Sequence, residues 1–298
     1  MSERLSEQSV RGEFTHVLRK LPQVTALFWV LKTIAVTLGE TSGDLLGITF
    51  GLGYATAAIV VAVYFIAAVT AQVRAHRFRP ALYWTVVLGT SMVGTEISDL
   101  LNRGFGHGSA PEGIGYGWGA VLLTCVLVLV FLAWWRTGQT FDVENISSHT
   151  GEILYWAAIL VSNTLGTSSG DWLADDTGVG YRGAFAVIAV VLMLILAAHY
   201  LTPVNGTVLF WPAFVLTRPL GAAGGDALTK PAGSGGLGWG TAGGSMTLLA
   251  MLLVLTAYQS RHVARHPLPP LPAPVNRRTG RTQRPNGAPV APTAAAAR

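Results

Sequence analysis

The chain has 298 residues, of which 51% are hydrophobic and 12% are charged, and its mean hydropathy is +0.46. This balance lies outside the range of soluble globular domains and predicts an all-α integral membrane protein. The single cysteine, Cys125, excludes an intramolecular disulfide and a thiolate metal cluster. Its position in an apolar run predicts a small, buried packing residue.

Apolar runs of roughly the length that crosses a bilayer, about 20 residues, occupy residues 55–73, 119–135, 183–198 and 246–258. Four more spans, interrupted by polar residues and glycines, start at Pro22, Pro80, Glu152 and Gly206. The two kinds alternate along the chain, which predicts eight transmembrane helices within residues 21–259. A segment of residues 1–20 precedes them, and a Pro-, Ala- and Arg-rich tail of residues 260–298 that we expect to be disordered follows.

The formal net charge is +5 and the isoelectric point is near 9.6, but the basic residues are not placed for nucleic-acid binding. Fifteen Lys and Arg residues flank one set of span ends, whereas Arg103, Arg182 and Lys230 lie at the other set. By the positive-inside rule, this bias predicts a multi-pass membrane protein with both termini in the cytoplasm. We therefore expect the lipid bilayer, and no nucleic acid, as a partner.

Each interrupted span carries the same aromatic and acidic pattern. A Trp that follows Phe or Tyr is followed ten residues later by a glycine and fifteen residues later by an aspartate, and these four aspartates are among only seven in the chain. The three columns are Trp29, Trp84, Trp156 and Trp211; Gly39, Gly94, Gly166 and Gly221; and Asp44, Asp99, Asp171 and Asp226. The chain is therefore a fourfold repeat.

Each repeat is predicted to be a helical hairpin, with boundaries at about 21–78, 79–140, 150–203 and 204–259. The Trp residues are spaced by 55, 72 and 55 positions, so the first pair of repeats maps onto the second with a constant offset of 127. Because each repeat crosses the membrane twice, all four have one orientation, which gives parallel pseudo-symmetry. Polar side chains avoid lipid, so we expect the Trp-bearing spans to form an inner layer.

This pattern resembles a family of bacterial membrane-anchored proteins built from four tandem copies of a repeat of unknown function. In that family each repeat has two transmembrane segments and a characteristic Trp, which Trp29, Trp84, Trp156 and Trp211 match here. The resemblance covers about residues 21–259 and includes the ending "LGETSGD" of the first span. It implies the repeated fold and a location in the bacterial inner membrane, and it implies no activity. The fourth repeat departs from the others, because "RPLGAAGGD" has neither a hydroxyl nor a second acid.

The aspartate column has two interpretations. Each Asp follows a small residue and precedes a short segment, as an N-cap after a helix break would. Alternatively, carboxylates at helix breaks of matching depth bind a small cation or protons, and oxygen ligands favour Mg²⁺, Ca²⁺ or Mn²⁺. Only the first two repeats add a second acid on the same helix face, which favours a leading role for them. The residues of this cation site are Glu40, Asp44, Glu96, Asp99, Asp171 and Asp226.

Two basic residues fall inside the interrupted spans. Arg218 lies deep in its span and is predicted to pair with a carboxylate, whereas Lys32 is expected either to pair or to extend toward the cytoplasmic interface. The four Trp residues suit an interfacial aromatic belt or, alternatively, stacking on a substrate.

The chain contains neither a G-x-x-x-x-G-K-[ST] phosphate loop nor an H-E-x-x-H zinc motif, so we expect no enzymatic activity. Two functions fit the pattern: a secondary transporter, as a cation or proton-coupled exporter, or a membrane scaffold or signal-transmitting protein in which the Gly and Asp columns are structural. No cofactor and no oligomeric state follow from the sequence.

Overall fold

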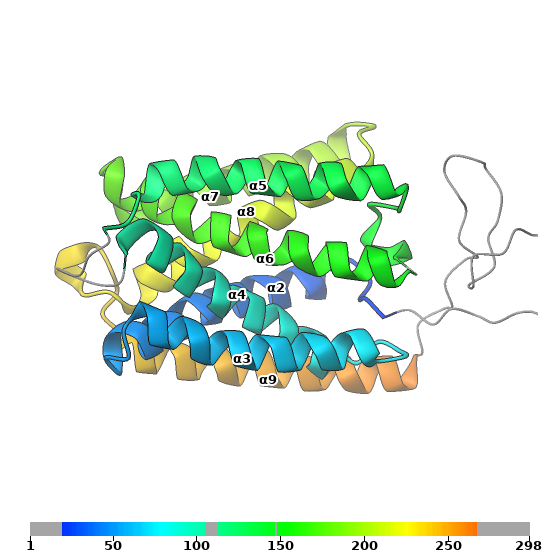
Figure 1. Ribbon diagram of the computed structural model, residues 1–298, viewed down its shortest axis with the longest axis horizontal. Helices are drawn as coiled ribbons and strands as arrows, with labels where there is room; N and C mark the ends of the chain where they lie inside the picture. Colours follow the sequence, from blue (N-terminus) through cyan, green and yellow to red (C-terminus); the bar gives the residue numbers. More distant parts are fainter. Residues whose placement is uncertain (1–19, 105–111, 147, 267–298) are drawn as a thin grey trace, which may run out of the picture.

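The computed structural model describes residues 20–104, 112–146 and 148–266, which are all-helical and contain no strand (Figure 1). Among these residues are eight helices of 19 residues or more, together with four short helical segments. The long helices are α2 (Ala26–Asp44), α3 (Tyr54–Arg74), α4 (Pro80–Arg103), α5 (Tyr116–Thr137), α6 (His149–Asp171), α7 (Gly180–Leu201), α8 (Gly206–Thr229) and α9 (Gly240–Arg265). The short ones are η1 (Leu45–Thr49), η2 (Val143–Asn145), η3 (Trp172–Asp176) and η4 (Ala232–Ser234).

The helix starts follow from local sequence. The side chains of Thr25, Ser148 and Asn205 accept hydrogen bonds from backbone N–H groups in the first turns of α2, α6 and α8. Pro80 begins α4, where its missing N–H removes no helical hydrogen bond. At the other end of the chain, α9 continues to Arg265, past the predicted boundary at residue 259. Residues 1–19 and 267–298, which hold the rest of the predicted terminal segments, lie outside the described residues.

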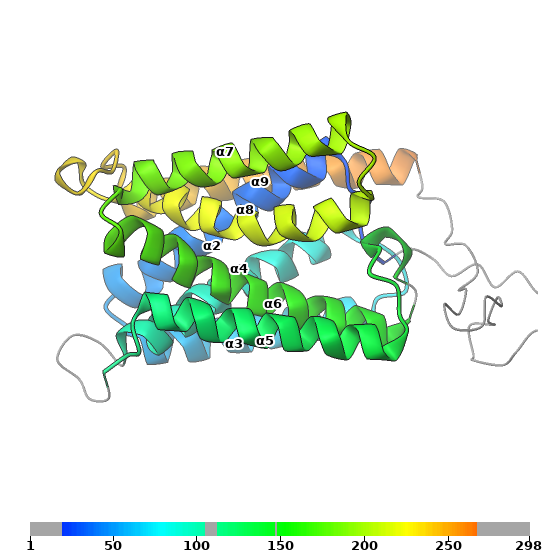
Figure 2. The same ribbon diagram turned by 90° about the horizontal axis from the view of Figure 1, so that it is seen from above.

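The eight helices form two layers (Figures 1 and 2). Helices α2, α4, α6 and α8 pack side by side in a closed ring, in the order α2–α4–α6–α8–α2, and all four begin at the same end of the molecule. Helices α3, α5, α7 and α9 run in the opposite direction on the outside. The predicted inner layer of Trp-bearing helices is therefore confirmed.

The two helices of one repeat hardly touch. Instead, α3 packs on α4, α5 on α6, and α7 on α8, while α9 closes the circle on α2. Each outer helix thus covers the inner helix of the next repeat, and the last repeat covers the first. Each predicted hairpin is therefore present as two consecutive, antiparallel helices, but these helices pack on the neighbouring repeats rather than on each other.

The glycine column sets the contacts within the ring. Each column glycine packs against the residue three positions before the column glycine of the next inner helix. The pairs are Gly39 with Ser91, Gly94 with Asn163, Gly166 with Arg218, and Gly221 with Val36. A Cβ at Gly94 would lie 2.9 Å from the backbone nitrogen of Thr164, closer than side chains approach. Close helix packing through small residues therefore recurs at all four interfaces, as it does in membrane helix bundles.

An aromatic layer fills the ring where the inner helices begin. Trp84, Trp156 and Trp211 are no more than 9% exposed and pack among Phe and Tyr rings. The hydroxyls of Tyr83 and Tyr155 lie 2.7 Å apart. For these three Trp residues the expected interfacial belt is wrong, because other rings and the outer helices cover them: Trp84 donates to Gln259 of α9, and Trp211 packs on Trp134 of α5.

The outer layer differs in composition from the ring. Helices α3, α5, α7 and α9 are long and apolar enough to cross a membrane by length and composition, whereas the inner helices, also predicted as spans, do not meet that measure. Many polar residues of the inner helices are buried, and many apolar residues of the outer helices are exposed. Cys125 of α5 is exposed too, so the expected buried packing role was wrong.

Candidate cation site

The six predicted carboxylates all lie in the second half of the inner helices and are buried, with Asp44 the most exposed at 6%. They are not at helix breaks. Asp44 and Asp171 end their α-helices but continue directly into the π-helical turns η1 and η3, while Asp99 and Asp226 lie inside α4 and α8. The helices continue through the glycines because neighbouring helices pack against them there.

The capping interpretation is also wrong for the two aspartates that precede a new segment. Asp44 and Asp171 have helical backbone angles and make no side-chain cap hydrogen bond. An N-cap needs an extended backbone that lets its side chain reach the N–H groups ahead, and neither residue has one.

Three carboxylates from three different helices meet inside the ring. One carboxylate oxygen each from Glu40 of α2, Asp171 of α6 and Asp226 of α8 lie within 4.8 Å of one another, and all three residues are buried. Oxygens on opposite sides of a Ca²⁺ ion are about 4.6–5.2 Å apart, given metal–oxygen distances of about 2.3–2.6 Å. The spacing therefore suits a hard cation of that size, and it groups two acids from the second half of the chain with one from the first.

Arg218 occupies the side of this cluster that faces the aromatic layer. Its Nη2 lies 2.7 Å from Glu40 Oε2 and donates to Thr95 Oγ1 at 2.6 Å, while Thr95 donates to the same Glu40 oxygen at 3.1 Å. The predicted pairing of Arg218 with a carboxylate is confirmed. Arg218 is fully buried, and its Nε and Nη1 have no hydrogen-bond partner in the described structure.

Two further cations lie at the other side of the cluster, and sequence reasoning missed them. Lys230 Nζ lies 3.0 Å from Asp44 and 3.5 Å from Asp226, and Arg103 Nε lies 3.5 Å from Asp99. Both cations follow a column aspartate by four residues, a helical ion-pair spacing that could have identified them. Burial alone would lower the pKa of Lys230, but the carboxylates of Asp44 and Asp226 outweigh it and raise that pKa above its ordinary value.

Two of the six carboxylates have no ion pair among the described residues. Asp171 has none, and Glu96, which is 1% exposed, has an Oε2 without a hydrogen-bond partner. The carboxyl group of Glu96 faces the backbone at Gly43 and Gly47 of the first repeat. Because the paired cations are fewer than the carboxyl groups, full ionisation leaves negative charge that protons or a bound cation must neutralise.

Lys32 meets neither expectation. Its side chain is fully buried, so it does not extend to an interface, and it makes no ion pair. Its Nζ lies 4.1 Å from the centroid of the Phe214 ring, at the aromatic layer.

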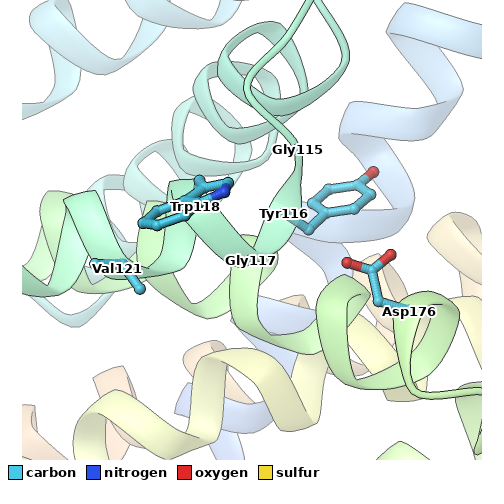
Figure 3. Close-up of a pocket in the computed structure, with 6 residues that line it drawn as sticks. All are labelled: Gly115, Tyr116, Gly117, Trp118, Val121 and Asp176. Atoms are coloured by element: carbon cyan, nitrogen blue, oxygen red, sulfur yellow. The ribbon is translucent and has the colours of Figure 1, made fainter.

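A pocket of about 350 Å³ opens at the end of the ring that carries the aspartates (Figure 3). Tyr116 and Trp118 point away from each other at the start of α5, with Asp176 of η3 beside Tyr116. The Tyr116 hydroxyl accepts a hydrogen bond from Arg103 and lies 3.5 Å from Asp99 Oδ1. One wall of this surface pocket is therefore in direct contact with the carboxylate layer. The lining residues are Gly115, Tyr116, Gly117, Trp118, Val121 and Asp176.

Comparison with known proteins identifies the repeat. No curated protein and no solved structure matches the chain. The family model described as Repeat of Unknown Function (DUF347) matches residues 27–78, 82–140, 154–204 and 209–263. Each matched segment covers most of one inner helix and of the outer helix that follows it, so the chain belongs to the family built from this Repeat of Unknown Function (DUF347).

Proposed function

We propose that the protein is a secondary transporter in the bacterial inner membrane that moves a small cation, coupled to protons, through the ring of α2, α4, α6 and α8. The observation that carries the proposal is the meeting of Glu40, Asp171 and Asp226 inside the ring, with ligand oxygens within 4.8 Å. Ionisable groups inside a membrane domain are expensive and mark ion pathways. Three buried acids from three helices suit a cation-binding role.

The ligand atoms around the cluster limit which cations can bind there. Carboxylate and hydroxyl oxygens surround the cluster, and neither a thiolate nor an imidazole is among its described members. Such ligands favour Mg²⁺, Ca²⁺ or Mn²⁺ over softer metals, and they also accept protons. A divalent cation or protons would each neutralise the negative charge that the paired cations leave.

Arg218 gives the site a competing positive charge. A cation that binds Glu40 must share or replace the bond from Arg218, which also holds Thr95 of α4. Binding would thus loosen a link that joins α8 to α2 and α4 across the ring. A transporter needs such a link between occupancy and helix arrangement, because a ligand shifts a conformational equilibrium only through differential contacts.

For the topology we propose eight spans with both ends in the cytoplasm. The four inner helices lack the apolarity of lipid-facing spans because the outer helices cover them. Arg74, Arg136 and Arg265 lie at one end of the molecule, and Arg103 and Lys230 lie at the end that carries the aspartates. The positive-inside rule places the first of these ends in the cytoplasm.

Flux into proteoliposomes tests the proposal, with Mg²⁺, Ca²⁺ and Mn²⁺ offered in turn under an imposed pH gradient. We expect flux of at least one ion, and a loss of at least tenfold in Asp171→Asn and Asp226→Asn. The control Asp175→Asn removes the same charge from an exposed residue of η3 and should transport normally. If none of the ions or protons moves, or if both variants transport like the control, the carboxylates serve a non-transporting scaffold instead.

A further inference from the structure

Lys32 is a buried charged residue of the inner ring that the cation site does not use and that has no ion pair among the described residues. It is 0% exposed, its Nζ has no hydrogen-bond partner in the described structure, and the nearest favourable contact is the face of Phe214 at 4.1 Å. A smaller apolar side chain would fill this position without the free-energy cost of burying an unpaired amine. Phe214 occupies the equivalent position of the fourth repeat, seven residues before the column glycine, so the fold itself does not need a cation there.

The surroundings of Lys32 contain one other positive charge. Helix α2 packs against α4, α8 and α9. From α8, Arg218 acts electrostatically on Lys32. The titratable group that α4 places in the aromatic layer is Tyr83, whose hydroxyl is bonded to Tyr155. The other ionisable groups of α4 (Glu96, Asp99 and Arg103) lie in the carboxylate layer, and those of α9 (Tyr258, Arg261, His262 and Arg265) are exposed.

Lys32 and the cation site are close enough to sense each other. Glu40 lies eight residues after Lys32 on α2, which at 1.5 Å per residue separates them by roughly 12 Å along the helix. A unit positive charge and a divalent cation at that distance, with an effective dielectric constant near 20, repel enough to weaken binding by about a hundredfold. The aromatic layer and the outer helices keep bulk solvent from screening this repulsion.

We infer that Lys32 is a proton-binding site that exchanges its proton against the cation of the carboxylate cluster. Cation binding at Glu40, Asp171 and Asp226 drives the Lys32 ammonium to release one proton to solution and leave a neutral amine. When the cation leaves, the amine takes the proton back. This inference rests on the proposed function, and it specifies the coupling as exchange of the cation against a proton.

Mn²⁺ binding to the purified full-length protein in detergent tests the inference, since electron paramagnetic resonance counts free Mn²⁺ and an indicator dye reports released protons. Lys32→Met fixes the position as neutral and Lys32→Arg fixes it as charged. We expect Lys32→Arg to bind Mn²⁺ about a hundredfold more weakly than Lys32→Met. Wild type should resemble Lys32→Arg at low pH and Lys32→Met at high pH, and should release up to one more proton per Mn²⁺ than Lys32→Met.

The carboxylates also bind protons, but they are present in every variant, so the difference between variants isolates Lys32. Arg74→Met removes an exposed positive charge from α3 and should behave as wild type. Lys32→Gln is a second neutral variant should Lys32→Met fail to fold. Identical affinities and proton release in wild type and the neutral variant at every pH would overturn the inference and leave the cation site standing. A wild type that binds no Mn²⁺ would overturn the cation site, and the inference with it.

Discussion

Arg218 and Glu40, from the last and the first repeat, form a fully buried ion pair with 2.7 Å between Nη2 and Oε2. Removing one member leaves the other charged and unpaired, so Arg218→Met should lower the free energy of unfolding by roughly 3–5 kcal/mol. The double variant Arg218→Met with Glu40→Gln should recover much of that loss. Thermal unfolding in detergent measures both. Equal stability of the single variant and wild type would show that the pair does not hold the ring.

The glycine column predicts a steric effect. Gly94→Ala places a methyl group 2.9 Å from the Thr164 backbone nitrogen, which can move only with the helix. Overpacking of this kind costs about 1–3 kcal/mol. Gly243→Ala in α9 is the matched control, because no atom lies within 4 Å of its Cβ position. The control should melt at or above the wild-type temperature and Gly94→Ala below it; the opposite order would contradict the close packing of α4 on α6.

Lys230 predicts a dependence on alkaline pH. Its pKa is raised in the folded protein, so its stabilising contribution is complete below the unfolded value of about 10.4 and is lost as pH rises toward the folded value. Lys230→Met should therefore lose roughly 1–3 kcal/mol at pH 7 to 9 and less at pH 11. Lys230→Arg should keep its stability at pH 11, because a guanidinium stays charged. Melting temperatures of the three proteins between pH 7 and pH 11 show whether the contribution of Lys230 falls as pH rises.

The paired phenols of the aromatic layer predict a non-additive result. Tyr83→Phe leaves the Tyr155 hydroxyl buried without its partner at 2.7 Å, which should cost roughly 1–3 kcal/mol. Tyr83→Phe combined with Tyr155→Phe removes both hydroxyls and should be close to wild type. A double variant that loses twice as much as the single one would mean that each phenol has other partners.

The sequence was sufficient for the architecture wherever a feature recurs in all four repeats. The Trp, Gly and Asp columns identify the inner helices, and the buried pairing of Arg218 follows from the expense of a charge inside a span. The choice of packing partner was out of reach, because nothing in one repeat says that α3 covers α4 rather than α2. Such a choice depends on surfaces that meet only in the folded ring.

The site illustrates the same limit. Pairing acids within one helix pointed to the first two repeats, whereas the ring brings Asp171 and Asp226 to Glu40 from other helices. The charge bias identified Lys230 and Arg103 only as basic residues at span ends, although each follows its aspartate by one helical turn. Lys32 could not be placed, since no local rule distinguishes an exposed amine near a helix start from one covered by Phe214.

The covering of α2 by α9 has a consequence for how such a chain originated. A chain of two repeats would contain α2 to α5, leaving α2 bare and α5 without an inner helix to cover. Two such chains would complete each other, with α5 of one copy lying on α2 of the other, and would close the same ring as a homodimer. The constant offset of 127 residues between the halves of this chain matches the fusion of two such copies. After fusion each half could diverge in sequence. This divergence would explain why no other repeat has a basic residue at the position equivalent to Lys32 or to Arg218.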